Sequence, residues 1–94
     1  VLANVVSNED NVKQVVTKVQ LGEADAGIVY TSDAVAAPEL MTIEIPDDLN
    51  VIATYPIAPL VNSSNADLAA AFVEYVLSSD GQAVLQKWGF IPPQ

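Results

Sequence analysis

The groups of this chain that could hold a small ligand lie at two points of the sequence, Asn11–Val12 and Tyr30. If Asn11 is the N-cap of a helix, Val12 is its first residue, and the N–H of Val12 has no partner inside that helix. Tyr30 ends an apolar run over residues 26–30 and carries a phenolic hydroxyl. An open helix amino end and a phenol at the carboxyl end of a strand can together bind one small anion by hydrogen bonds alone.

Each of these features also has an ordinary explanation. Every helix has an amino end, and a tyrosine that ends an apolar strand commonly fills a core while its hydroxyl contacts water. A cap at Asn8 instead of Asn11 would place Glu9 and Asp10 in the first helical turn, where their carboxylates would compete with a bound anion. The residues alone therefore leave open both the position of the cap and the role of the phenol.

The residue types that most enzymes and metal sites need are absent. The chain has no Cys and no His, which excludes disulfides, thiolate nucleophiles, Cys/His zinc sites and a Ser-His-Asp triad. Adjacent carboxylates occur at Glu9–Asp10 and Asp47–Asp48, but neither pair matches the calcium loop Asp-x-Asp-x-Asp-Gly, and solvated turns explain both. We therefore expect no metal, no cofactor and no enzymatic activity.

The composition indicates an acidic, globular chain. Three lysines stand against 12 Asp and Glu, so the net charge is −9 and nucleic acid would be repelled. The hydrophobic fraction of 51% predicts a packed core, and it is high enough in 94 residues that part of the apolar surface is expected to pack against further protein. No apolar run approaches the length that spans a bilayer.

Apolar spacing predicts the elements around the two candidate points. Valines at 12, 15, 16 and 19 follow the spacing of one helix face, and Gly22 is suited to end that helix in a left-handed conformation. Residues 26–30 are apolar on both faces and predict a buried strand. A short helical turn is expected over 34–37, ended by Pro38.

The remaining segments alternate between strand and helix patterns. Strands are predicted over 1–6, 41–45 and 51–61, although Pro56 and Pro59 restrict the last to an edge strand or a crossover. Helices are predicted over 68–76 and from Ser79, where Ser79 and Gln82 fit a capping box. This order of elements predicts an α/β fold.

Several segments occur in an order and spacing that resemble those of a known family. In chain order they are Asn11-Val12, Gly22-Glu-Ala-Asp-Ala-Gly-Ile-Val-Tyr30, Ser32-Asp-Ala34, Tyr55-Pro-Ile-Ala58, Phe72 to Leu77, Ser78-Ser-Asp-Gly-Gln82 and Trp88-Gly-Phe90. With them, nearly the whole chain resembles the carboxyl-terminal part of bacterial molybdate-binding proteins, the extracytoplasmic solute-binding components of ABC importers.

The resemblance implies a two-lobed α/β fold of the periplasmic-binding-protein type II. Residues 1–61 would be part of the second lobe with the return crossover, and residues 62–94 the helices that pack back on the first lobe. The implied ligand is molybdate or tungstate, bound by the backbone N–H of Val12 and the hydroxyl of Tyr30, with Asn11 as the helix N-cap. The implied partner is an ABC permease, and the implied location is periplasmic or extracytoplasmic, with a membrane anchor at an N-terminus outside this sequence.

A full member of the family is more than twice as long as this chain. The isolated chain is therefore expected to bind molybdate poorly, because it holds only part of the donor set, and to self-associate through surfaces that a first lobe would cover. Two alternatives remain: a ligand-sensing domain of a transcription regulator with the same fold, and an inactive self-associating fragment.

Overall fold

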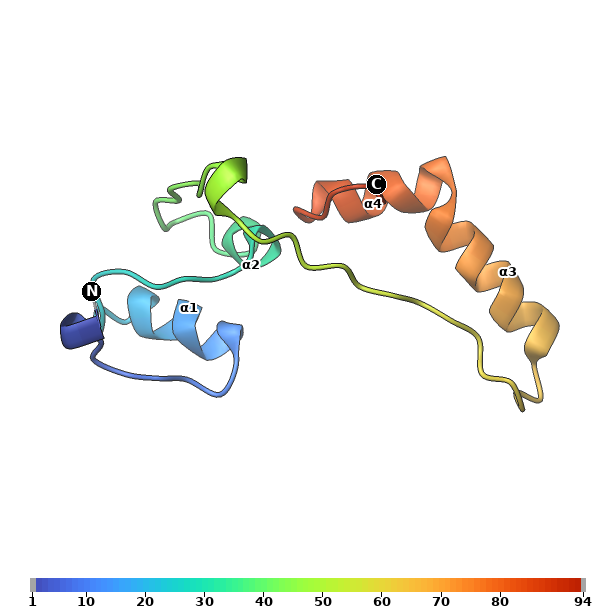
Figure 1. Cartoon of the computed structure of the whole chain (residues 1–94), viewed down its shortest axis with the longest axis horizontal. Coiled ribbons are helices and arrows are strands. Elements are labelled where there is room, and N and C mark those ends of the chain that lie inside the picture. Colours follow the sequence, from blue (N-terminus) through green and yellow to red (C-terminus); the bar gives the residue numbers. More distant parts are fainter. Residues whose placement is uncertain (1, 94) are drawn as a thin grey trace. The chain divides into compact units, whose positions relative to one another are not determined.

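The structure, a computed structural model, describes residues 2–93. The described chain forms two compact units (Figure 1). The first comprises residues 2–42 together with Trp88–Phe90, and the second comprises Ile43–Lys87 together with residues 91–93. The predicted division at residue 61 concerns the lobes of a larger fold and stays a prediction.

The first long helix, α1 (Val12–Gln20), agrees with the predicted span. It ends at Gly22, whose φ of +74° lies in the left-handed region as predicted. The N–H of Gly22 donates to the carbonyl of Val19 at 3.1 Å, and the N–H of Glu23 donates to the carbonyl of Lys18 at 2.9 Å. These two bonds form a Schellman motif, which satisfies the last carbonyls of the helix and turns the chain back toward it.

The second helix, α2 (Thr31–Val35), begins earlier than predicted. The expected turn over residues 34–37 is wrong in its start, because Tyr30 is the N-cap and Asp33 is the third helical residue. The carboxylate of Asp33 accepts the N–H of Tyr30, which fixes the start of the helix at Thr31. The helix ends three residues before Pro38, consistent with the restriction that proline imposes on the residue before it.

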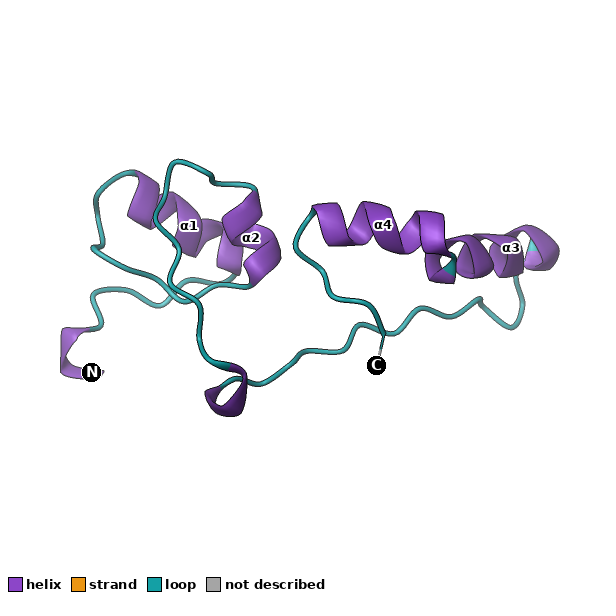
Figure 2. Cartoon of the chain, turned by 90° about the horizontal axis from the view of Figure 1, so that it is seen from above, coloured by secondary structure: helices purple, strands orange, loops and turns teal. Residues whose placement is uncertain are grey.

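No strand forms among residues 2–93 (Figure 2). Residues 2–4 form a short 3₁₀ turn, η1 (Leu2–Asn4), so the predicted strand over 1–6 is wrong there. The predicted strands over 26–30, 41–45 and 51–61 are irregular backbone. Apolar sequence favours extended backbone, but a strand also needs a neighbour for its hydrogen-bond ladder, and none of these segments has one here. The two-lobed α/β fold class stays a prediction.

The segment before Tyr30 lies close against the apolar face of α1, and α1 also contacts α2. A Cβ placed on Gly27 would lie 2.5 Å from Cγ1 of Val15 and 3.3 Å from Cγ2 of Val19. Such separations are well inside van der Waals contact, so only glycine lets this backbone approach the valine side chains. The predicted inner face of α1 therefore packs on the backbone at Gly27, even though the segment around it forms no strand.

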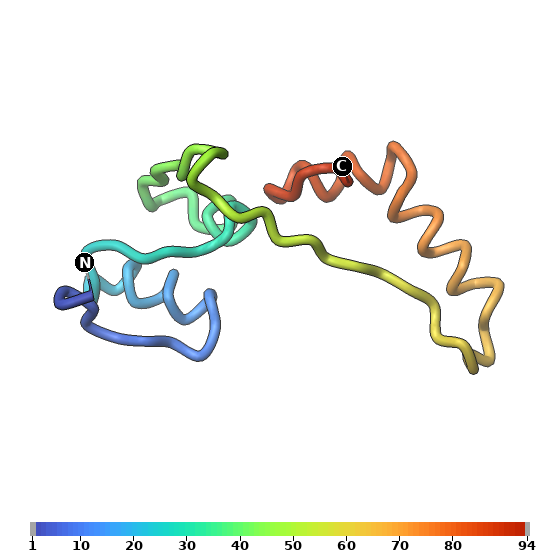
Figure 3. Tube along the Cα trace, in the orientation of Figure 1, coloured from blue at the N-terminus to red at the C-terminus, as the bar shows by residue number. Residues whose placement is uncertain are grey.

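The second unit begins with a 3₁₀ turn, η2 (Asp47–Leu49), and continues through irregular backbone. Residues 51–60 run without a turn, as the tube in Figure 3 shows. Two helices follow, α3 (Ala66–Leu77) and α4 (Ser79–Lys87). Both agree with the predicted helical regions.

A tight corner joins α3 to α4. The hydroxyl of Ser78 accepts the N–H of Gly81 at 3.2 Å, so Ser78 caps α4 and the predicted cap at Ser79 is wrong by one residue. The side chain of Gln82 instead donates to the carbonyl of Val76 at 2.8 Å. A Cβ on Gly81 would lie 2.2 Å from the carbonyl oxygen of Tyr75, so the corner requires glycine at this position.

The described residues contain very little core. Ala37 is the one apolar side chain among them that is fully buried, and no large side chain is. Many large apolar side chains of both units are more than half exposed, including Ile28, Met41, Val51 and Phe72. The predicted packed core is therefore not formed by these residues alone.

Candidate functional site

The amino end of α1 has the cap that the sequence predicted. The side-chain oxygen of Asn11 accepts the N–H of Gln14 at 3.0 Å, and the side-chain oxygen of Gln14 accepts the N–H of Asp10 at 3.2 Å. Asn11 is therefore the N-cap, and the alternative cap at Asn8 is wrong. The first turn of α1 contains no acidic residue, so no carboxylate of the helix itself occupies the position that an anion would take.

The first two helical N–H groups, on Val12 and Lys13, form no hydrogen bond with any residue in the range 2–93. The side chain of Asn11 accepts the N–H of Gln14. The N–H groups of Val12 and Lys13 therefore remain as donors at the positive end of the helix dipole. Such an end attracts an oxyanion.

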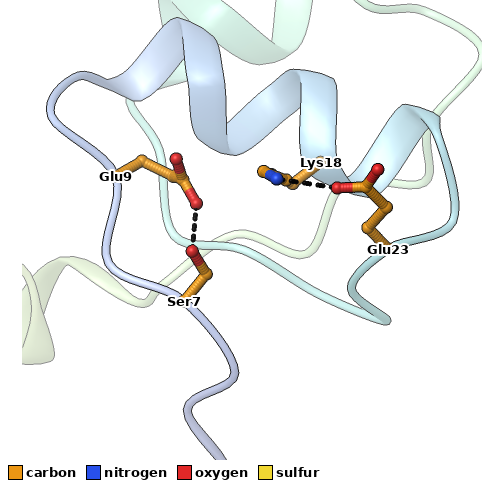
Figure 4. Close-up of polar contacts among 4 residues, drawn as sticks. All are labelled: Ser7, Glu9, Lys18 and Glu23. Atoms are coloured by element: carbon orange, nitrogen blue, oxygen red, sulfur yellow. Dashed lines mark hydrogen bonds and ion pairs between the residues drawn. The ribbon is translucent and has the colours of Figure 1, made fainter.

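One ion pair and one hydrogen bond to a carboxylate lie near α1 (Figure 4). The ammonium of Lys18 lies 2.7 Å from a carboxylate oxygen of Glu23, and the carboxylate of Glu9 accepts the hydroxyl of Ser7. The hydrogen bond to Glu23, the charge of Glu23 and then the charge of Glu9 raise the pKa of Lys18 above its usual 10.5. Glu9 therefore lies outside the helix with its own partner, instead of in the first turn.

Tyr30 occupies the N-cap of α2, and its backbone is held on both sides. Its N–H donates to Oδ2 of Asp33 at 3.1 Å, and its carbonyl accepts the N–H groups of Asp33 at 3.0 Å and Ala34 at 3.2 Å. The side chain is half exposed. Sequence reasoning missed the role of Asp33, although an acidic residue three positions after a cap is a known signal of a capping box.

A distant part of the sequence also contacts this helix start. A Cβ on Gly89 would lie 3.0 Å from both N and Cα of Ser32 and 3.1 Å from the carbonyl carbon of Thr31. A glycine just after a helix commonly ends it, and this is the one role that the sequence indicates for Gly89. Its contact with α2 had no signal in the sequence, because it joins residues far apart along the chain.

The two predicted donors, at Val12 and Tyr30, belong to the same compact unit, in which α1 packs against α2. Whether they converge on one ligand stays a prediction. Among residues 2–93, no group of three or more acidic side chains lies close enough to hold a metal ion.

A separate hollow in the second unit does not suit an anion. It lies against the start of α3 and is lined by Ser63, Asn65, Leu68, Ala69, Ala71 and Phe72. None of these side chains is charged, and the exposed surface of the hollow is mainly apolar.

No helix formed by residues 2–93 has the length and hydropathy needed to cross a membrane.

The chain is similar in sequence to known proteins. The family described as bacterial extracellular solute-binding protein matches residues 1–91. The molybdate-binding protein ModA of Mycobacterium tuberculosis is 40% identical over 91 residues, which cover 96% of this chain and 35% of that protein. ModA of Escherichia coli is 30% identical over 82 residues, which cover 86% of this chain and 32% of that protein.

A third relative, the putative ABC transporter substrate-binding lipoprotein YvgL of Bacillus subtilis, is 31% identical over 81 residues, which cover 85% of this chain and 31% of that protein. The chain thus spans about a third of the length of the curated relatives that it matches. No solved structure matches it at a significant level. Since the family match covers nearly all of its length, the chain belongs to the family of bacterial extracellular solute-binding proteins.

Proposed function

We propose that this chain is the part of an ABC importer's receptor that supplies two donors to a bound molybdate or tungstate ion. The observation that carries the proposal is the amino end of α1, where the N–H of Val12 is unbonded within the described chain and Asn11 supplies the cap. Similarity to two proteins named for molybdate binding supports the choice of ligand. The proposed fold of the whole receptor is the two-lobed α/β architecture.

A site built from N–H and O–H donors selects for a fully ionised anion. Each oxygen of a dianion can accept a hydrogen bond, whereas the O–H of a protonated anion would face another donor and lose one. Molybdate and tungstate are doubly charged at neutral pH and similar in size, so this site binds both. Sulfate is smaller and fits more loosely. The negative charge of the whole chain does not prevent this binding, because N–H donors at close range outweigh a diffuse surface charge.

The receptor acts outside the cytoplasm, since the family is extracellular. It is a binding protein and not an enzyme. Its proposed partner is the permease of an ABC importer, and its proposed attachment to the membrane is a lipid anchor on a preceding segment. The name of the Bacillus subtilis relative, a substrate-binding lipoprotein, supports both and favours a receptor over a transcription regulator.

Thermal unfolding of the full-length protein tests the proposal. A ligand that binds only the folded state stabilises it by about 2.7 kcal/mol when its concentration is 100 times its Kd, so molybdate should raise the unfolding midpoint clearly. The rise should be smaller for Tyr30→Phe, which lacks one donor to a charged ligand. Tyr75→Phe, which removes a hydroxyl from α3, is the matched control and should keep the full rise. An equal rise in all three proteins would remove Tyr30 from the site.

The proposal extends to self-association of the 94 residues when they are produced alone. A folded monomer of 9.9 kDa exposes about 5,200 Å² by the usual scaling of area with mass, whereas this chain exposes 8185 Å². Many large apolar side chains are exposed, and exposed apolar surface tends to pair with another copy. Sedimentation should show association that increases with concentration, and a well-ordered monomer at all concentrations would contradict it.

A further inference from the structure

Gly89 ends α4 in a left-handed conformation, and it also lies at a location that its neighbours in sequence do not explain. Its φ of +88° lies in the left-handed region, two residues after the end of α4 at Lys87. At this point the chain leaves the second unit, and Trp88–Phe90 belong to the first. The Cα of Gly89 faces the peptide group between Thr31 and Ser32, and an added Cβ would approach three atoms of that backbone to within 3.0–3.1 Å.

The atoms that Gly89 contacts belong to the first turn of α2, directly after Tyr30. They are backbone atoms, which cannot rotate away as a flexible side chain could. Tyr30 itself is held to the same turn by its bonds with Asp33. The peptide between Thr31 and Ser32, one residue beyond Tyr30, therefore lies in a turn that the bonds of Tyr30 fix and that Gly89 approaches.

We infer that Gly89 is a positioning residue for Tyr30: its lack of a side chain lets Trp88–Phe90 seat on the first turn of α2 and thereby sets the direction of the phenol toward the bound oxyanion. The inference rests on the proposed function, because it assigns Gly89 a role at that same site. A methyl group at this position must displace either the turn of α2 or the Trp88–Phe90 segment. Either movement shifts the hydroxyl of Tyr30, and a hydrogen bond to an anion weakens steeply with distance and angle.

Gly22 provides a matched control for the experiment. Its φ of +74° is also left-handed, but a Cβ placed on it meets nothing within 4 Å. Gly22→Ala and Gly89→Ala thus share the strain of a left-handed alanine, and only Gly89→Ala adds the collision. Both variants of the full-length protein should unfold at a lower temperature than the wild type. In calorimetric titration with molybdate, Gly22→Ala should keep the wild-type Kd, and Gly89→Ala should weaken binding by roughly tenfold or more.

A double-mutant cycle with Tyr30→Phe separates positioning from general damage. If Gly89 acts through the phenol, Gly89→Ala should weaken molybdate binding in the wild type and change it little in the Tyr30→Phe background. The inference is overturned if Gly89→Ala binds as tightly as Gly22→Ala, or if it weakens binding equally in both backgrounds. If the wild type binds neither molybdate nor tungstate, the proposed function fails, and this inference fails with it.

If Gly89→Ala does not fold, Phe90→Ala tests the positioning of Tyr30 by the Trp88–Phe90 segment. It loosens the same segment without adding an atom against α2. The expected result is weaker molybdate binding in the wild type and little further change in the Tyr30→Phe background. Unchanged binding by folded Phe90→Ala, or an equal loss in both backgrounds, would overturn the inference.

Discussion

Gly27 lies so close to Val15 that a Cβ on the glycine would come within 2.5 Å of the valine Cγ1. Through this contact, the segment before Tyr30 packs on α1, the helix that begins at Val12. The two predicted donors are thus connected through one packing contact as well as through the chain.

Gly27→Ala should destabilise the first unit by about 1–3 kcal/mol, as overpacking commonly does. The added methyl must displace the Val15 side chain or push the segment off α1. Val15→Ala removes the colliding group, so Gly27→Ala should cost less in that background. Denaturant unfolding of the four proteins in the cycle measures this. Equal losses in both backgrounds would show that the collision is not the cause.

Gly81→Ala should destabilise the α3–α4 corner by about 2–3 kcal/mol, because its Cβ would lie 2.2 Å from a backbone carbonyl oxygen that cannot move without breaking the turn. Ser79→Ala is the matched control, since Ser79 is exposed and also in the first turn of α4. It should change stability by less than about 0.5 kcal/mol. Denaturant midpoints distinguish the two, and similar midpoints would contradict the tight corner.

The ion pair between Lys18 and Glu23 should give a small stability effect that disappears in alkali. The pKa of Lys18 is raised, so the folded protein binds this proton more tightly than the unfolded chain does. The stabilisation is therefore fully present below the unfolded pKa, near 10.5, and is lost as the pH rises through the higher folded value. Both side chains are about half exposed, so solvent and salt screen the effect.

Melting curves of the wild type and Glu23→Gln measure that loss. The difference in midpoint should stay constant from neutral pH toward 10.5 and vanish above it. Asp25→Asn, which removes the same charge two residues away, should show no such alkaline transition. A difference that grows in alkali would mean that the pair does not stabilise the charged lysine.

The 94 residues alone should bind molybdate far more weakly than the full-length protein. They carry only part of the donor set, and each lost hydrogen bond to a charged ligand removes about 1.5–3 kcal/mol. Calorimetric titration of the two proteins under one buffer condition makes the comparison. Micromolar or tighter binding by the short chain would show that these residues hold a complete site.

Local signals in the sequence were sufficient to predict α1, α3 and α4 and the cap of α1. The valine spacing, Asn11 and Gly22 all act within a few residues of one another, and the structure has α1 where they predict it. The cap of α4 was placed one residue late, because Ser78 and Ser79 are both capable caps and only the packing of the corner selects between them.

Contacts between distant residues were not predictable in the same way. The approach of Gly89 to Ser32 depends on how the chain returns to α2, which no local pattern encodes. The apolar sequences of residues 26–30 and 51–61 favour extended backbone. A strand forms only when its backbone pairs with a neighbouring strand, and the described residues provide none.

The central claim is that the backbone N–H of Val12 binds the oxyanion, and proline can remove that single donor. Val12 is the first residue of α1, where proline fits a helix, and Asn11 before it is already extended, with φ −152° and ψ 162°. Val12→Pro should therefore keep the helix, and Val12→Ala, which keeps the N–H, is its control. Calorimetric titration of the full-length protein with molybdate should show wild-type affinity for Val12→Ala and roughly 10- to 100-fold weaker binding for Val12→Pro. Equal affinity in the two folded variants would contradict the claim.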